Sequence, residues 1–206
     1  MHKEDLNRFF KESAIKDKDL PSAAALAHFQ IKLQLTPEIG DEFRSLMNEV
    51  VYNSQPQREG KVLAEREEIE SADSSQIIRF MRRSVDTINQ NILVNRGVAL
   101  EDEIVPEVIR MLKTSLNDEF IETSARLLSA CSRDVAKELI EYFDDVRSPY
   151  ARSMILVVLG FKAEETHIPW LIEKYREMKQ DYPNEAYCDG AYYALYEIES
   201  RFYPAI

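Results

Sequence analysis

The side chains that most often carry chemistry are few in this chain and lie far apart. The three histidines are His2, His28 and His167, and none belongs to an HxxxH or HExxH motif. Cys131 and Cys188 form no CxxC pair, and neither has a neighbouring histidine that would activate its thiol. We therefore expect no catalytic residue, no metal site and no cofactor, and two reduced thiols with structural roles.

Carboxylates occur in three short clusters, each next to an expected helix start or in a turn between helices. The clusters are Glu101–Glu103, Asp144–Asp145 and Glu164–Glu165. The dipole of a helix stabilises negative charge at its N-terminus, which is sufficient reason for most of these residues. Their functional interpretation is an acidic edge that recognises a basic partner.

The overall charge argues against polyanionic partners. The chain of 206 residues has 26 basic and 37 acidic residues and a formal net charge of −11. Such a surface repels nucleic-acid phosphates and anionic lipid headgroups and favours basic proteins. The one basic cluster, Arg79, Arg82 and Arg83, has the spacing of one helix side, and we expect it to pair with neighbouring carboxylates.

The composition predicts an all-α protein. Only 5 residues are glycine, whereas 45% are hydrophobic and 31% are charged. Turn-rich β-sandwiches and phosphate-binding loops need more glycine than this. The N-terminus has no apolar signal core, and the longest apolar run, Met154–Phe161, is much shorter than the ~20 residues that span a bilayer. We expect a cytoplasmic protein with no membrane partner.

An apolar pattern recurs about every 31 residues from residue 74 onward. Within each unit the apolar positions have the spacing of one helix face. These positions are Val105, Val108, Ile109 and Leu112, then Ala136, Leu139, Ile140 and Phe143, then Ile168, Leu171, Ile172 and Tyr175. Further helices are expected over 116–131, 147–161 and 184–202. The pattern predicts a helix, a short turn and a second helix in each unit.

The unit that begins at residue 147 has the most distinctive sequence. It has a polar-proline start, then an arginine, an apolar pair and a Leu-Gly pair before a loop, which here are Ser148-Pro149, Arg152, Met154-Ile155 and Leu159-Gly160. This arrangement resembles the short HEAT-like repeats of the phycobilisome-lyase type. The resemblance covers about residues 74–202, although Glu122 replaces the arginine in the preceding unit. It implies an α-solenoid of right-handed stacked helix pairs and says nothing about chemistry.

Residues 1–73 precede the repeats and form an irregular helical part that we expect to pack on the stack. Thr36 and Pro37 make a strong helix start. The passage YNSQPQREG at 52–60 is the most loop-like in the chain, and the residues after it are mostly charged. We expect a mobile segment within 53–73, and a domain of stacked repeats over 74–206.

The apolar run after Ser153 fits an inner helix of such a stack. An inner helix packs on its own partner and on both neighbouring units, so its sequence loses the usual alternation of apolar and polar faces. In this helix, Arg152 and Leu156 remain candidates for contact with another molecule.

The last helix has more aromatic side chains than an end cap needs. Tyr192, Tyr196 and Tyr203 form a stripe, with Tyr193 beside it. Tyrosine combines a large contact area with a polar tip, and interfaces favour it. The tyrosines either pack on the repeat behind them or form a ligand surface or a homodimer contact.

These patterns together predict a non-enzymatic protein–protein interaction module, an adaptor or regulatory scaffold. If the second helices line a concave face, one contact strip runs along them. The strip comprises Glu119, Glu122, Arg126, Arg152, Leu156, Tyr192, Tyr193 and Tyr196. Two alternatives stay open. One is an enzyme or enzyme accessory with a carboxylate such as Glu122 in the groove. The other is an acidic immunity or regulatory protein that binds a basic partner.

Overall fold

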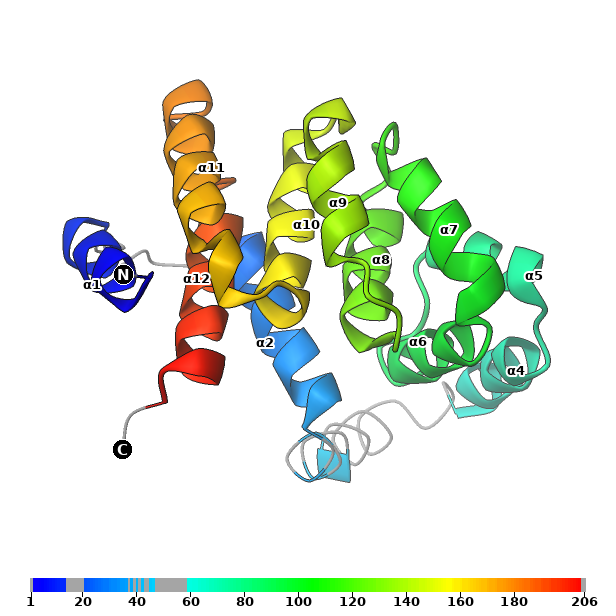
Figure 1. The fold of residues 1–206 in the computed structure, drawn as a ribbon. Helices are drawn as coiled ribbons and strands as arrows, with labels where there is room; N and C mark the ends of the chain where they lie inside the picture. The colour runs from blue at the N-terminus through cyan, green and yellow to red at the C-terminus, as the bar shows by residue number, and fades with distance from the viewer. Residues whose placement is uncertain are drawn as a thin grey trace. The chain divides into compact units, whose positions relative to one another are not determined.

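Helices make up all the regular structure in the part of the chain that the structure describes (Figure 1). This computed structural model describes residues 2–13, 21–36, 38, 40, 42, 45–46 and 59–204. Across these residues there is no strand, which confirms the all-α prediction, and no helix is long and apolar enough to cross a membrane. The expected helix after Thr36 and the part of the expected mobile segment at 53–58 lie mostly outside the described residues.

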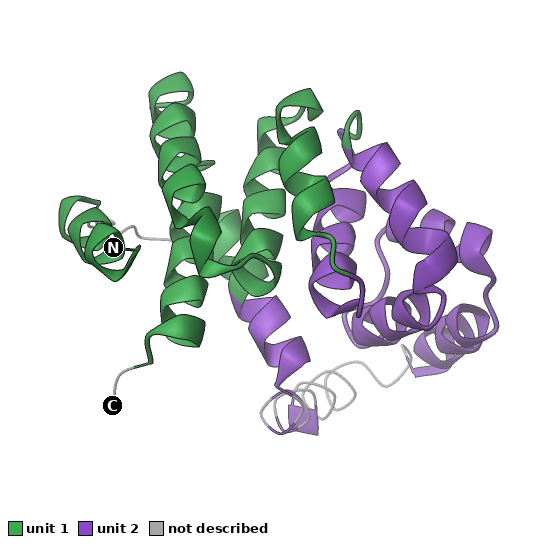
Figure 2. Ribbon diagram, viewed as in Figure 1, with its two compact units in different colours: residues 1–28, 113–115, 134–206 green, residues 29–112, 116–133 purple. Residues whose placement is uncertain are grey.

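The chain forms two compact units (Figure 2). Unit 1 contains residues 1–28, 113–115 and 134–206, and unit 2 contains residues 29–112 and 116–133. Helix α2, Ala23–Leu35, contributes residues to both. The domain boundary expected between residues 73 and 74 stays a prediction.

Unit 2 is built around helix α6. Its helices are α4 (Glu59–Glu70), α5 (Ser74–Met81), α6 (Gln90–Ala99), α7 (Glu101–Leu112) and α8 (Asp118–Ala130). Side chains fix two of the helix starts. Asp73 and Gln76 form a reciprocal capping box at α5, and Asn117 accepts a 2.7 Å hydrogen bond from the Phe120 amide at α8. Helix α6 contacts α4, α5, α7 and α8, so it lies at the centre of this unit.

Unit 1 contains the two C-terminal helix pairs and the N-terminal helix. Helix α9 (Ala136–Tyr142) continues into a short 3-10 helix and precedes α10 (Pro149–Lys162). Helix α11 (Ile168–Asp181) then precedes α12 (Asp189–Phe202). Helix α1 (His2–Glu12) buries Leu6 and Phe9 and contacts both α11 and α12. The N-terminal helix therefore belongs to the same unit as the last helix pair.

Helix α10 is the apolar centre of unit 1. Ser148 caps it by accepting a hydrogen bond from the Ala151 amide, and Pro149 occupies the first turn, where a missing N–H has no cost. All side chains from Ser153 to Leu159 are buried, because α10 contacts both α9 and α12. The expected burial of this run on several sides is confirmed.

Two glycines allow α10 and α12 to approach at backbone distance. A Cβ atom added at Gly160 would lie 2.8 Å from the Cα of Ala194. A Cβ atom added at Gly190 would collide with the carbonyl oxygen of Ser153. Neither glycine has a positive φ, so close packing rather than backbone conformation requires these residues.

The apolar positions that recur in the sequence lie on α7, on α9 and the 3-10 helix after it, and on α11. All four in α7 are buried, and so are all four in α11. Of the four positions in the second repeat, Ala136, Leu139 and Phe143 are buried, whereas Ile140 is partly exposed. Within unit 2, helices α6 and α8 contact each other, and within unit 1, α10 and α12 do the same.

Candidate functional site: the aromatic face of helix α12

The residues of the expected contact strip belong to different units. Glu119, Glu122 and Arg126 lie on α8 in unit 2, and the other five residues lie on α10 and α12 in unit 1.

On α8, the structure buries the cation and exposes one carboxylate. Arg126 is only 8% exposed, and its guanidinium donates hydrogen bonds to the side-chain oxygens of Gln34, Gln90 and Asn91. Such bonds to three amide groups hold α8 against α6 and the end of α2. Glu122 is exposed and Glu119 is half-buried, so these two remain accessible to a partner.

On α10, Leu156 is buried, whereas the half-buried Arg152 is bonded to the turn that precedes the helix. The guanidinium of Arg152 donates a 2.7 Å hydrogen bond to the carbonyl of Val146 and a 3.1 Å bond to that of Asp144. Leu156 is 0% exposed. Because a partner cannot reach a fully buried side chain, Leu156 does not belong to any contact surface of this structure.

The first tyrosine of α12 packs against the N-terminal helix. The ring of Tyr192 makes an edge contact with Phe10 at 5.4 Å between centroids and a tilted contact with Phe9 at 6.1 Å. Phe9 in turn makes an edge contact with Tyr175 of α11 at 4.9 Å. These aromatic rings join three helices of unit 1.

The other two tyrosines lie around a buried histidine. The His28 ring stacks on Tyr193 and on Phe161, each at 5.4 Å between centroids, and Tyr196 approaches its edge at 6.0 Å. Nε2 of His28 lies 2.9 Å from Oε2 of Glu197, and both residues are buried. Tyr193 is half-buried, whereas Tyr196 is 51% exposed.

The half-buried phenols are held in the neutral form. Burial raises the pKa of Tyr192, and the nearby Tyr175 hydroxyl adds to the effect. Burial also raises the pKa of Tyr193, with a further contribution from Asp189. A neutral phenol both donates and accepts hydrogen bonds, so this face offers polar tips on large apolar rings.

The spacing of the tyrosines does not indicate that Phe9 and Phe10 of the N-terminal helix cover Tyr192. Leu6, Phe9 and Phe10 have the spacing of one helix face, a signal that predicts an amphipathic N-terminal helix. Nothing in the spacing of His28 indicates its partner, because Glu197 is 169 positions away.

The described residues offer little support for a metal site or for an enzymatic groove at Glu122. No three His, Cys, Asp or Glu side chains there lie close enough together to hold a metal ion. One hollow lies on α5 and the turn after it, lined by Gln76, Arg79, Phe80 and Arg83, and another lies between α1 and α11. Glu122, the acid of the enzymatic alternative, lines neither of these two hollows.

No protein-family model, curated protein or solved structure significantly matches the chain.

Proposed function

We propose that this chain is a non-enzymatic protein–protein interaction module built on HEAT-like helix pairs, and that its partner binds at Tyr196. The observation that carries the proposal is the exposure of this ring. Tyr196 is 51% exposed between the buried residues Leu195 and Glu197, and it lies beside the half-buried Tyr193. Large aromatic rings with a polar tip are the side chains that interfaces most often use as anchors.

The contacts within each unit support the repeat architecture. In HEAT-like stacks, a helix contacts its own partner and the equivalent helices of neighbouring pairs. Helix α10 contacts α9 and α12, and α8 contacts α7 and α6, as this rule requires. The similar spacing of buried positions in α7, α9 and α11 agrees with it. A stack of helix pairs offers a rigid surface for binding, which suits an adaptor or regulatory scaffold.

Charge favours a basic protein as the partner over a second copy of this chain. Each copy has a formal net charge of −11, so two copies repel each other at long range. A basic partner is attracted by the same field, and the partly exposed Glu199 follows Tyr196 by one helical turn on α12. The same repulsion disfavours a homodimer through α12.

A photo-crosslinking experiment tests the proposal. A benzophenone amino acid replaces Tyr196 in one variant and the exposed Leu63 of α4 in a matched control. After irradiation in cells of the native host, we expect mass spectrometry to identify a basic protein attached at position 196 and not at position 63.

Two outcomes would contradict the proposal. Identical sets of crosslinked proteins at the two positions would mean that Tyr196 marks no specific surface. Crosslinking of the chain to itself alone, with a dimer mass in light scattering, would replace the basic partner by a second copy. Weakening of a captured complex by added salt would support the charge argument.

A further inference from the structure

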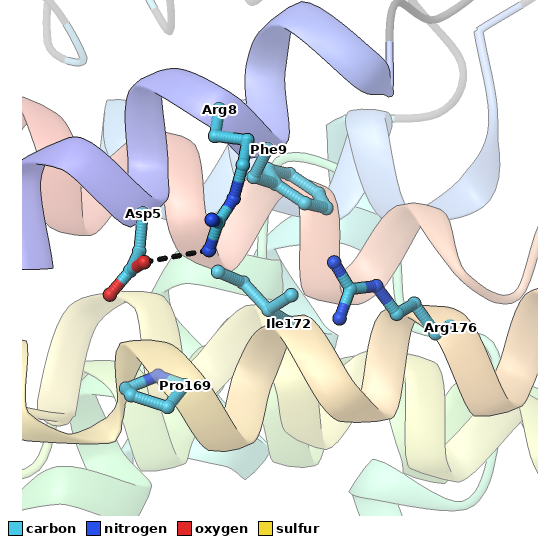
Figure 3. Close-up of a pocket in the computed structure, with 6 residues that line it drawn as sticks. All are labelled: Asp5, Arg8, Phe9, Pro169, Ile172 and Arg176. Atoms are coloured by element: carbon cyan, nitrogen blue, oxygen red, sulfur yellow. Dashed lines mark hydrogen bonds and ion pairs between the residues drawn. The ribbon is translucent and has the colours of Figure 1, made fainter.

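A small hollow in unit 1 combines an apolar floor with two arginines. It lies between helices α1 and α11 and has a volume of about 160 Å³. Six residues line it: Asp5, Arg8, Phe9, Pro169, Ile172 and Arg176 (Figure 3). None of these belongs to the expected contact strip, and none is Tyr196.

The floor of the hollow is held in place by packing. Phe9 is 3% exposed, and its ring makes the 4.9 Å edge contact with Tyr175. Ile172 is also buried, on the inner face of α11. Only a small part of each side chain is exposed, so a ligand meets a small apolar surface that is already ordered, which lowers the entropic cost of binding.

The two arginines differ in how they are paired. Arg8 donates a 2.9 Å hydrogen bond to Oδ1 of Asp5, one turn earlier in α1. Arg176 is exposed and makes no hydrogen bond or ion pair with any residue that the structure describes. Figure 3 shows its side chain extending toward Phe9 and Ile172, with Arg8 on the other side of Ile172. The unpaired guanidinium is thus available to an anion in the hollow.

The charge of the lining selects the class of anion. Asp5 offsets one of the two arginines, so the lining has one net positive charge, in a chain whose net charge is −11. One negative charge balances it, which fits a carboxylate better than a phosphate near −2. The planar guanidinium of Arg176 matches the two oxygens of a carboxylate, and the floor suits a short chain of methylene groups.

We propose that this hollow binds a single carboxylate attached to a short apolar chain. The anion accepts hydrogen bonds from Arg176, and the apolar chain lies on Phe9 and Ile172. Such a group occurs in a small organic acid and in the glutamate side chain of a protein. The site does not depend on the proposed partner at Tyr196.

A titration monitored by NMR of the arginine Nε–H signals tests the site in the full chain. The probes are butyrate, its uncharged analogue butyramide, and inorganic phosphate. We expect butyrate to shift the signals of Arg176 and Arg8, butyramide to shift neither, and phosphate to bind more weakly than butyrate. Arg176→Gln should weaken butyrate binding by roughly fivefold or more, because it removes the charge-assisted hydrogen bonds.

Arg147→Gln is the matched control, because Arg147 is an exposed arginine of the same unit that does not line the hollow. It removes the same charge and should change affinity by less than about twofold, since salt screens distant charges. Asp5→Asn should strengthen binding, because it removes the competing carboxylate.

Peptides with blocked ends separate the two sources of the carboxylate. One peptide contains a single glutamate, and its counterpart has glutamine in that position. If the glutamate peptide binds more tightly than butyrate and the glutamine peptide does not, the site is assigned to a protein partner. Tighter binding of butyrate assigns it to a small acid. Equal loss of affinity in the Arg176 and Arg147 variants, binding of phosphate as tight as that of butyrate, or no shift with any probe would overturn the proposal. Failure at this site leaves crosslinking at Tyr196 unaffected, so the two proposals fail separately.

Discussion

His28 and Glu197 form a buried pair between helices that lie at opposite ends of the sequence. Nε2 of His28 lies 2.9 Å from Oε2 of Glu197, and the side chains are 11% and 5% exposed. The His28 ring also stacks between Phe161 and Tyr193. The pair therefore fixes the first half of α2 onto α12 beneath the candidate surface at Tyr196.

Replacement of Glu197 should destabilise unit 1, and more strongly when the new side chain offers no acceptor to His28. Glu197→Ala leaves the buried imidazole without this acceptor and should lower the free energy of unfolding by about 3 kcal/mol. Glu197→Gln keeps an oxygen acceptor and should cost less, about 1 kcal/mol. Urea unfolding followed by circular dichroism measures both. Equal stability of the two variants would show that the hydrogen bond to His28 contributes nothing.

The close approach of α10 and α12 predicts a sharp dependence on residue size at two glycines. Gly160→Ala and Gly190→Ala each place a methyl group against backbone atoms, of Ala194 and Ser153 respectively. Backbone cannot move aside as a side chain can, so each should cost about 1–3 kcal/mol of stability. Thermal unfolding measures the loss.

Gly60 provides the control for these substitutions. It lies in helix α4, and a Cβ atom added there meets nothing within 4 Å. Gly60→Ala should therefore leave the protein as stable as before or more stable by about 0.5–1 kcal/mol, because alanine favours the helix. A destabilisation equal to that at Gly160 would contradict the role of packing.

The helices could be predicted from the sequence more closely than the surface they expose. The ranges that the repeat predicts, 116–131 and 147–161, agree with the observed bounds of α8 and α10 within about two residues, and the structure shows that Asn117 and Ser148 cap these two helices. Helix α12 starts later than expected, at Asp189, because the chain from Pro183 to Cys188 forms turns.

The contact strip was less predictable. Helical spacing shows which residues share one face of a helix, but it does not show which other part of the chain covers that face. Arg126 and Leu156 occupy such a face, yet amide side chains surround the guanidinium of Arg126, and Leu156 is fully buried. For Tyr192, the covering residues Phe9 and Phe10 come from the far end of the chain. A long-range contact of this kind leaves no local pattern in the sequence.

Lys174 should make the stability of unit 1 depend on pH in the alkaline range. Its ammonium donates hydrogen bonds to Glu177 at 2.8 Å and Asp144 at 3.1 Å. Burial lowers the pKa of Lys174, but the two carboxylates together outweigh burial, so its pKa is raised. A raised folded-state pKa stabilises the protein fully below the unfolded-state value of about 10.4, and this contribution is lost as the pH rises through the folded-state pKa.

The variant Lys174→Met isolates this effect, because it keeps most of the apolar stem beside Phe143 and Trp170. The wild-type protein should lose up to about 1 kcal/mol relative to the variant between about pH 8 and pH 11, as both acceptors are substantially exposed. Urea midpoints of both proteins at the two pH values measure the difference. If the two proteins differed in stability by the same amount at both pH values, the ion pairs would not favour the charged form of Lys174.

Arg152 should contribute to the stability of the folded protein. Its guanidinium satisfies the carbonyls of Val146 and Asp144, at the turn that leads into α10. Arg152→Ala removes both donors and should lower the free energy of unfolding by about 1–3 kcal/mol. Tyr196→Ala removes an exposed ring and should change stability by less than about 0.5 kcal/mol. Urea unfolding of the two variants side by side separates the roles. If Arg152→Ala were as stable as Tyr196→Ala, the guanidinium would not stabilise this turn. Arg152 would then again be a candidate for contact with a partner.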